Sequence, residues 1–325
     1  MAFLDEGITP PFYFFQCDDV ANVEESFSPR ALFEEAIAHR DSMQCGGGEK
    51  AAYRLLNERY DRCPGITADM YGSHCLIAVY SKYWMSHIDT FSALLKERFS
   101  KLASVRAVDN TSNTSRYKNY KCSHVWGEKF TQYCEVEEND CKFKIDLNNG
   151  LSTGLFLDQT VNRDLIATLA PTGSSLLNLF AYTCPFSVVA AKKGKYKTTS
   201  VDISRHFLDV GYENFKRNDI DTVDHVFVKQ DVIPFLVNAR KKSIEYDIVV
   251  CDPPTLFNSI SSEDGQRQNY SKKLVAMSCN KDYDELVVHA ARIVRQGGYL
   301  VLFCNSKSLR KKKWLEMVSK GLQKI

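Results

Sequence analysis

The chain has 325 residues, of which 44% are apolar and 12% aromatic, and its formal net charge is +2. This length and apolar content are typical of an ordinary soluble globular protein with a real core and about two domains. No run of about 18 apolar residues occurs, which argues against a membrane span. The acidic start MAFLDEGITPPFYFFQCDDV lacks the basic region of a signal peptide.

The eleven cysteines are scattered singly between Cys17 and Cys304, and none forms a C-x-x-C pair. An odd number of isolated cysteines argues against both a disulfide framework and a zinc module. We therefore expect no metal site and a reducing, cytoplasmic location.

The charge is unevenly distributed along the chain. Residues 151–325 hold 25 Lys and Arg against 18 Asp and Glu. The basic runs of this half are KKGKYK (192–197), RKK (240–242), KK (272–273) and RKKK (310–313). A single run of this kind is usually a solvated face, but several in one domain indicate a polyanionic partner such as RNA.

The first 50 residues form a segment with one predicted helix, at about 28–43. Pro29 would occupy its first position, and Leu32, Phe33, Ala36 and Ile37 would share one face. Residues 51–148 are predicted to form a small α+β domain that contacts RNA or substrate. Its expected strands lie near Tyr53, Ile66, Leu76, Val105, Tyr133 and Phe143, with a helix at 88–99 and an exposed polar loop at 109–121.

Residues 149–325 alternate strands and helices regularly. The predicted strands are 175–180, 198–202, 225–229, 247–251 and 299–303, and the predicted helices are 185–193, 205–218, 233–240 and 283–295. Such alternation gives a parallel sheet with right-handed crossovers. The predicted fold class is therefore α/β, a Rossmann-like domain preceded by a smaller α+β domain.

The first four strands of a parallel sheet end at one edge, where ligands bind. The segments that follow these strands are 178–185 (NLFAYTCP), Asp202-Ile203-Ser204, Gln230-Asp231-Val232 and Asp252-Pro253-Pro254. The two prolines end the fourth strand at Asp252. An acid after the second strand is placed to accept hydrogen bonds from a ribose diol, and an acid after the third can accept from an exocyclic amine.

The first of these turns contains no glycine, whereas a pyrophosphate requires a glycine-rich turn for close backbone approach. NAD and FAD are therefore disfavoured. S-adenosylmethionine carries the same adenosine without phosphates. Each acid alone could be an ordinary polar strand end, but acids at three consecutive strand ends favour an adenosine site.

Four stretches resemble the class I S-adenosylmethionine-dependent methyltransferases of bacterial large-subunit ribosomal RNA. They are YRLLNERYDRCPGITADMYG, GLSTGLFLDQTVNRDL, LLNLFAYTCPFSVVAAKKGKYKTTSVDIS and DIVVCDPPTLFNS. The resemblance implies S-adenosyl-L-methionine as cofactor and ribosomal RNA as partner. It also implies that Asp158 and Arg163 close the methionine end of the cofactor. The complete expected cofactor set is Asp158, Arg163, Asn178, Phe180, Tyr182, Asp202, Ile203, Ser204, Asp231 and Asp252.

Two subfamilies share this pattern, one methylating cytosine carbon-5 and the other guanine N7. DPPTLFNS followed by GGYLVLFCNSKS is more similar to the guanine-N7 group. The cytosine enzymes need a thiolate that attacks the ring, and their cysteine falls where Asn305 stands here. Cys304 is one residue away and would point to the other face, so we expect Cys304 and Cys251 to be small buried residues.

Guanine N7 already has a free lone pair, so the enzyme need only hold it in line with the methyl group. The expected catalytic residues are Asp252, Pro253, Pro254 and Asn305. In the substrate site, Phe257 or Leu256 would stack on the base and Asn258 would bind its edge.

Several departures from the family pattern bear on this reading. Cys184 stands where the family usually has glycine, and Ile260 where it has lysine. The fold normally adds a strand hairpin beyond the position of Ile325, so we expect a sheet without that hairpin. The N-terminal segment looks too short for the RNA-binding module of the cytosine enzymes.

Three alternatives to a guanine-N7 enzyme remain open. They are a cytosine-5 enzyme, a non-catalytic RNA-binding protein that retains the fold, and a small-molecule methyltransferase. The basic runs and the additional domain disfavour the last of these.

Overall fold

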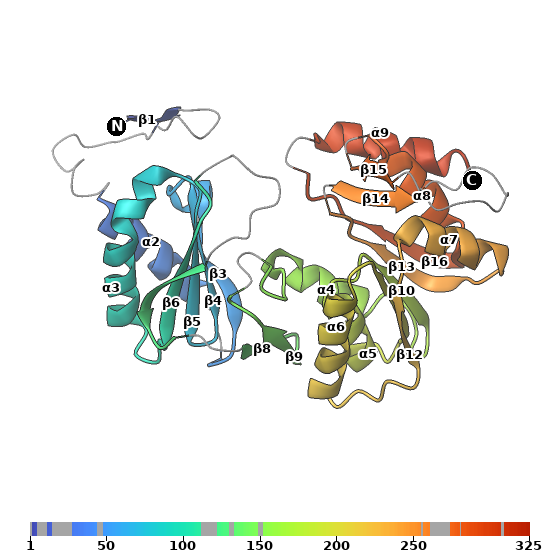
Figure 1. Ribbon diagram of the computed structural model, residues 1–325, viewed down its shortest axis with the longest axis horizontal. Helices are drawn as coiled ribbons and strands as arrows, with labels where there is room; N and C mark the ends of the chain where they lie inside the picture. Colours follow the sequence, from blue (N-terminus) through green and yellow to red (C-terminus); the bar gives the residue numbers. More distant parts are fainter. Residues whose placement is uncertain are drawn as a thin grey trace. The chain divides into compact units, whose positions relative to one another are not determined.

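The computed structural model describes residues 2–4, 12–14, 28–43, 48–111, 122–129, 133–148, 152–254, 256–260, 274–279, 281–306 and 309–325. The chain divides into two compact units, Met1–Leu157 and Asp158–Ile325 (Figure 1). Most of the polar stretch expected to be a loop at 109–121 lies outside the described residues.

The second unit is built on a five-stranded sheet in the order β12-β11-β10-β13-β16, and every neighbouring pair is parallel. The strands are β10 (Ser175–Leu179), β11 (Lys197–Asp202), β12 (His225–Lys229), β13 (Tyr246–Cys251) and β16 (Val294–Leu302). This confirms the predicted Rossmann-like α/β class. The order runs outward from β10 on both sides, as expected of a doubly wound sheet.

Helices cover both faces of this sheet (Figure 1). They are α4 (Thr160–Ile166), which follows a 3-10 turn at Leu157–Gln159, then α5 (Pro185–Lys193), α6 (Arg205–Arg217), α7 (Val232–Lys241), α8 (Tyr283–Ala291) and α9 (Lys311–Leu322). On β10, Leu176 packs with Ile166 of α4 and Phe186 of α5, whereas Leu177 packs with α7 and α8. Successive strand residues point to opposite faces, so both faces of a central strand are apolar and buried.

The end of α8 and the start of β16 differ from the prediction. The helix expected to reach residue 295 ends at Ala291, and β16 begins at Val294, where it pairs with Tyr246. The register then shifts so that Ile248 pairs with Tyr299. Gly297 lies in this irregular stretch with φ of 79°, a conformation that glycine adopts without strain.

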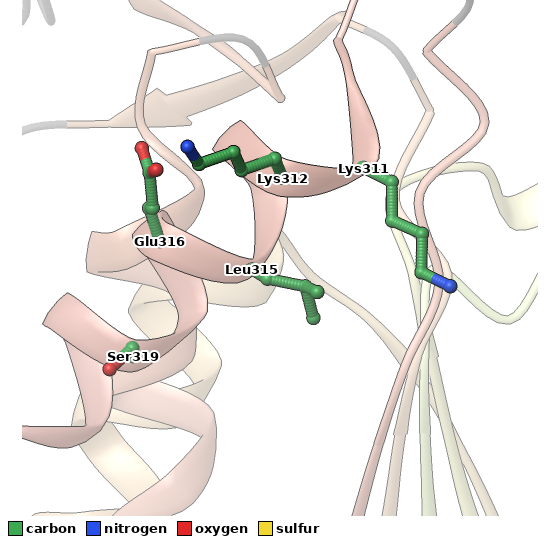
Figure 2. Close-up of a pocket in the computed structure, with 5 residues that line it drawn as sticks. All are labelled: Lys311, Lys312, Leu315, Glu316 and Ser319. Carbon is green, nitrogen blue, oxygen red and sulfur yellow. The ribbon is translucent and has the colours of Figure 1, made fainter.

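Helix α9 was expected only as a basic run. Its inner side packs Trp314, Met317 and Val318 against the core, and Gly321 is buried against α8. A Cβ on Gly321 would lie 2.7 Å from the Asp284 carbonyl oxygen, so close packing here requires glycine. Figure 2 shows the outer side, where a shallow hollow is lined by Lys311, Lys312, Leu315, Glu316 and Ser319.

The stretch after the two prolines contains an unexpected hairpin. Strand β14 (Leu256–Ile260) pairs antiparallel with β15 (Leu274–Ser278). The substrate residues predicted at Phe257 and Asn258 lie in β14, and their side chains are outside the described part of the chain.

The first unit contains a five-stranded sheet in the order β3-β4-β5-β6-β7, of which only the β5–β6 pair is parallel. Its strands are β3 (Ala52–Asn57), β4 (Ile66–Tyr71), β5 (His74–Val79), β6 (Ser104–Asp109) and β7 (Cys122–Gly127). Its helices are α2 (Pro29–Ser42), α3 (Ile88–Arg98) and two 3-10 turns at Glu58–Asp61 and Lys82–His87. Two hairpins add β1 (Ala2–Leu4) with β2 (Phe12–Phe14), and β8 (Cys134–Glu138) with β9 (Cys141–Ile145).

Helix α2 has a serine cap in addition to the proline and the apolar face predicted from its sequence. The Ser28 hydroxyl accepts from the Ala31 amide as N-cap, and Pro29 occupies the first turn. The four apolar residues predicted to share a face, Leu32, Phe33, Ala36 and Ile37, are all buried in the core of this unit.

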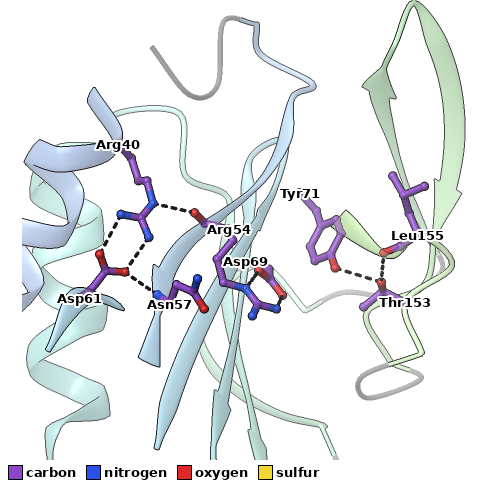
Figure 3. Close-up of polar contacts among 8 residues, drawn as sticks. All are labelled: Arg40, Arg54, Asn57, Asp61, Asp69, Tyr71, Thr153 and Leu155. Atoms are coloured by element: carbon purple, nitrogen blue, oxygen red, sulfur yellow. Dashed lines mark hydrogen bonds and ion pairs between the residues drawn. The ribbon is translucent and has the colours of Figure 1, made fainter. Parts of the chain in front are cut away.

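A buried ion pair ties α2 to the sheet of the first unit (Figure 3). Arg40 donates two hydrogen bonds, of 2.8 and 2.6 Å, to the carboxylate of Asp61, and a third to the Arg54 carbonyl. The Asp61 carboxylate also accepts from the Asn57 amide at 2.6 Å. The side chains of Arg40 and Asp61 are only 9% and 5% exposed, so water cannot replace either partner.

We predict that Asp61→Ala lowers the free energy of unfolding by about 3–5 kcal/mol, because it leaves the Arg40 charge buried without its partner. The control is Glu34→Ala, which breaks the pair of Glu34 with Arg30 on the same helix, where the two side chains are 50% and 48% exposed. That control should lose no more than about 1 kcal/mol. Urea denaturation of both variants measures the difference, and equal losses would contradict the special role of the buried pair.

Candidate active site

The carboxyl ends of β10, β11, β12 and β13 bring four segments to one edge of the sheet. Leu179 is in register with Val201 on one side and with Cys251 on the other, and Asp202 is in register with Lys229. The segments that follow these strands therefore emerge at similar levels. The strand order reverses between β10 and β13, and ligands of such sheets usually bind in a crevice at that point of this edge.

The loop after β10 has an uncommon backbone. Phe180, Tyr182 and Cys184 have φ of 57°, 53° and 61°, so three non-glycine residues adopt the left-handed conformation. The loop closes with a hydrogen bond of 2.8 Å from the Cys184 amide to the Ala181 carbonyl. The positive φ at Cys184 explains why glycine would suit this position.

Helix α6 provides the room that the Cys184 side chain needs. A Cβ on Gly211 would lie 2.4 Å from the Cys184 sulfur and 3.0 Å from its Cβ. Cys184 is fully buried, and burial raises the pKa of its thiol to about 12. The side chain is thus a packed thiol rather than an obstacle in the crevice.

Asp202, at the end of β11, is fixed by backbone donors. Its two carboxylate oxygens accept from the Tyr182 amide at 2.9 Å and from the Ser204 amide at 2.8 Å. Burial raises the pKa of Asp202, and the backbone hydrogen bonds oppose that rise. Each carboxylate oxygen can accept more than one hydrogen bond, so both can still bind a ribose diol. Ser204 itself caps α6.

Apolar groups flank this carboxylate. Ile203 is 63% exposed, and the rings of Tyr182 and Phe207 meet edge to face at 4.6 Å. Asp231 caps α7 by accepting from the Ile233 amide, and burial raises its pKa. A carboxylate with lone pairs free for a diol, an exposed apolar side chain and a second acid at the next strand end have the chemistry that an adenosine group requires.

Asp252 follows β13 on the other side of the crevice. The Asn305 amide donates to it at 3.3 Å. Burial and the nearby Asp158 carboxylate raise the pKa of Asp252 to about 6, while the Arg163 guanidinium opposes the rise. Arg163 is buried on α4, and Asp158 is exposed in the 3-10 turn before it. The structure thus brings together four of the residues predicted from the sequence.

Asn178 lies deeper than the edge. It is 1% exposed and donates to the Ser187 hydroxyl at 3.0 Å, which in turn contacts the Ser200 hydroxyl at 2.8 Å. This network joins β10, α5 and β11 beneath the loop. The Pro254 carbonyl accepts from the Cys279 thiol, so part of the proline segment contacts the end of β15.

The two cysteines expected to be buried differ. Cys251 is fully buried, and burial raises the pKa of its thiol well above the ordinary value. Cys304 is only half-buried, because it lies beyond the end of β16, where it packs against the same core as Cys279. The expectation of a buried residue is therefore wrong for Cys304.

The sheet order and the acids at its carboxyl edge are those of a Rossmann-like domain. The family model described as S-adenosylmethionine-dependent methyltransferase matches residues 66–307. The chain belongs to this family.

Relatives and solved structures agree with the assignment. The Bacillus subtilis protein named "Putative ribosomal RNA large subunit methyltransferase YwbD" is 30% identical over 82% of this chain. The aligned region spans 64% of YwbD. The ribosomal RNA large subunit methyltransferase of Deinococcus radiodurans is 28% identical over 81% of this chain and 70% of its own length. The crystal structure of SMU.776 complexed with SAH matches 98% of this chain and 78% of that one, with 25% identity and a TM-score of 0.79.

Two features are missing from the residues that the structure describes. No helix among them has the length and apolar character that a membrane crossing requires. No group of three or more His, Cys, Asp or Glu side chains among them is arranged to hold a metal ion.

We predict that Asp252→Asn stabilises the protein at neutral pH. The folded-state pKa of about 6 lies above the ordinary 3.8, so the stability linked to this group is present below about pH 4 and lost as the pH rises through 6. The amide cannot ionise, and the variant should gain about 2 kcal/mol at neutral pH and nothing near pH 4. Urea denaturation at both pH values measures this. A variant that is less stable at neutral pH would contradict the unfavourable ionisation.

Proposed function

We propose that the protein is an S-adenosylmethionine-dependent methyltransferase that acts on a base of large-subunit ribosomal RNA, with guanine N7 favoured. The observation that carries the proposal is the three-acid edge on a sheet of the family fold, in a chain aligned over 81% of its length with a methyltransferase named for that RNA. A ribosomal substrate and isolated free cysteines favour the cytoplasm as its location.

The proposed roles of the residues follow from their positions. The cofactor supplies an electrophilic methyl group on a sulfonium. Asp202 would hold the ribose diol, Asp231 the exocyclic amine of adenine, and Asp158 and Arg163 the methionine end.

The guanine edge would be oriented by the residues after β13 and β16, which are Asp252, Pro253, Pro254 and Asn305, with Phe257 and Asn258 on the substrate side. Positioning of a nucleophilic N7 is sufficient for transfer, and it can contribute a large rate enhancement.

The choice of base rests on the cysteines near this edge. Asn305 occupies the place of the nucleophilic cysteine in the cytosine-5 enzymes that the chain resembles. Cys251 is fully buried with a raised thiol pKa, which disfavours a thiolate. Cytosine-5 methylation is the second candidate, and the partial exposure of Cys304 is the observation that favours it.

We predict that Cys304→Ser and Cys251→Ser keep methyl transfer to RNA within about tenfold of the parent, because N7 needs no covalent catalyst. Asp252→Ala should lose at least about a hundredfold through misplacement of the base. Transfer of labelled methyl groups to unmodified large-subunit RNA, followed by nucleoside mass analysis, gives both the rate and the base.

The opposite pattern would support the cytosine reading. Loss of activity in Cys304→Ser alone, or a covalent adduct with RNA that contains 5-fluorocytidine, would overturn the guanine-N7 proposal. A non-catalytic scaffold is tested by calorimetry with S-adenosylhomocysteine, since a protein without a cofactor site should show no affinity.

The basic start of α9 is the proposed contact with RNA phosphates. Arg310, Lys311, Lys312 and Lys313 are all exposed, and Figure 2 shows Lys311 and Lys312 projecting from the helix. Lys320 and Lys324, further along the chain, are instead paired with Asp284. The first four cations are therefore better placed to neutralise phosphate.

We predict that replacing residues 310–313 with glutamine weakens RNA binding and makes the negative slope of log K against log salt less steep by about 3, because fewer counterions are released. Replacing Lys320 and Lys324 with glutamine is the matched control and should change the slope by less than about 1. Filter binding across a salt series measures both. RNA binding that does not depend on salt would argue for a small-molecule substrate.

A further inference from the structure

Asn214 is a fully buried polar residue in the interior of α6. Its side-chain amide donates at 3.1 Å to the Thr183 carbonyl, in the loop after β10. Asparagine has low helix propensity, and a buried amide is unfavourable unless it is hydrogen-bonded. The position therefore has a specific polar partner in the loop that flanks the cofactor crevice.

The residues on either side of Thr183 are held as well. The Tyr182 amide, one residue before Thr183, donates to the Asp202 carboxylate. Cys184, one residue after it, packs against Gly211 of α6. Thr183 itself is only 2% exposed, so water cannot readily take the place of the Asn214 amide.

The loop conformation needs such restraints. Three of its non-glycine residues have positive φ, a conformation that is less favourable for them than the ordinary backbone regions. Removing a restraint would allow the loop to relax. Relaxation would move the Tyr182 amide away from Asp202 and leave that carboxylate with only its hydrogen bond from the Ser204 amide.

We propose that Asn214 is a positioning residue of the cofactor site, which acts through the loop on Asp202. It holds the Thr183 carbonyl so that the Tyr182 amide fixes the carboxylate with its remaining lone pairs facing the crevice. This inference rests on the proposed function, because it assigns the loop to S-adenosylmethionine binding.

The test compares two substitutions that differ in hydrogen-bond chemistry. Asn214→Ala removes the donor at every pH. Asn214→Asp has nearly the shape of asparagine, and its protonated acid can donate to the Thr183 carbonyl whereas its carboxylate cannot. Burial raises the pKa of such an acid, so the exchange falls within an accessible pH range.

The expected result is a pH dependence found in one variant alone. By calorimetry, Asn214→Ala should bind S-adenosylhomocysteine about tenfold or more weakly than the parent at all pH values. Asn214→Asp should bind within about threefold of the parent at low pH and about tenfold more weakly at high pH. Ratios to the parent at each pH remove the titration of the edge acids themselves.

Asn218→Ala is the matched control. Asn218 is 5% exposed, lies four residues further along the chain, donates to the Asn214 carbonyl and accepts from Lys192. Its loss should lower the thermal midpoint and leave the affinity within about threefold of the parent. Calorimetric stoichiometry counts folded sites, so partial unfolding would reduce the stoichiometry rather than the affinity.

The outcomes separate a failure of this inference from a failure of the proposed function. Parent-like affinity in Asn214→Ala would overturn the inference and leave the proposed function standing. Equal loss in Asn218→Ala, or a constant ratio for Asn214→Asp across pH, would show a general packing effect and overturn it too. Absence of affinity in the parent would overturn the proposed function and this inference together.

Discussion

The parallel register of β10 with its two neighbours is the constraint on which the site depends. Leu179 is level with Val201 and Cys251, so the loop after β10, Asp202 and Asp252 emerge around one crevice. Apolar packing on both faces sets this register, because Leu176 and Leu177 point into different core clusters. A slip of one residue would exchange these faces, so the core rather than the polar residues places the acids.

The loop after β10 shows how packing can replace glycine. The Cys184 side chain occupies space beside α6 that is open because residue 211 is glycine. The glycine that this packing requires therefore lies in the helix rather than in the loop. Hydrogen bonds from Tyr182 to Asp202 and from Asn214 to Thr183 then hold a backbone that is strained by itself. Tertiary contacts thus offset the unfavourable backbone energy of the left-handed residues, so this loop can form without a glycine-rich turn.

Local signals predicted much of the fold. The signals of α2 are Pro29 at its start and its apolar spacing, and that of β13 is its β-branched run. They act within a few residues, and both elements lie where they were expected. Helix α9 was missed because its basic start masked the spacing of Trp314, Met317 and Val318. The early start of β16 depends on pairing between Val294 and Tyr246, which are distant in sequence.

The site residues likewise fall into those that the sequence predicts and those that only the packing reveals. Acids at strand ends could be read from the sequence, since the alternation of strands and helices places them at one edge. Gly211 and Asn214 could not, although each is unusual in a helix interior. Their partners, Cys184 and Thr183, are about 30 residues away, so only the packing of α6 against the loop reveals their roles.

The acids at the carboxyl edge of the sheet affect both the stability of the protein and its affinity for a ligand. Burial raises the pKa of Asp202, Asp231 and Asp252, so ionisation of each is unfavourable in the protein alone. Ligand groups that donate hydrogen bonds or carry positive charge stabilise the ionised carboxylates and so recover part of that free energy. A site of this kind is less stable empty than a neutral one of the same shape, and under the proposed function it would bind a cationic nucleoside more tightly for the same reason.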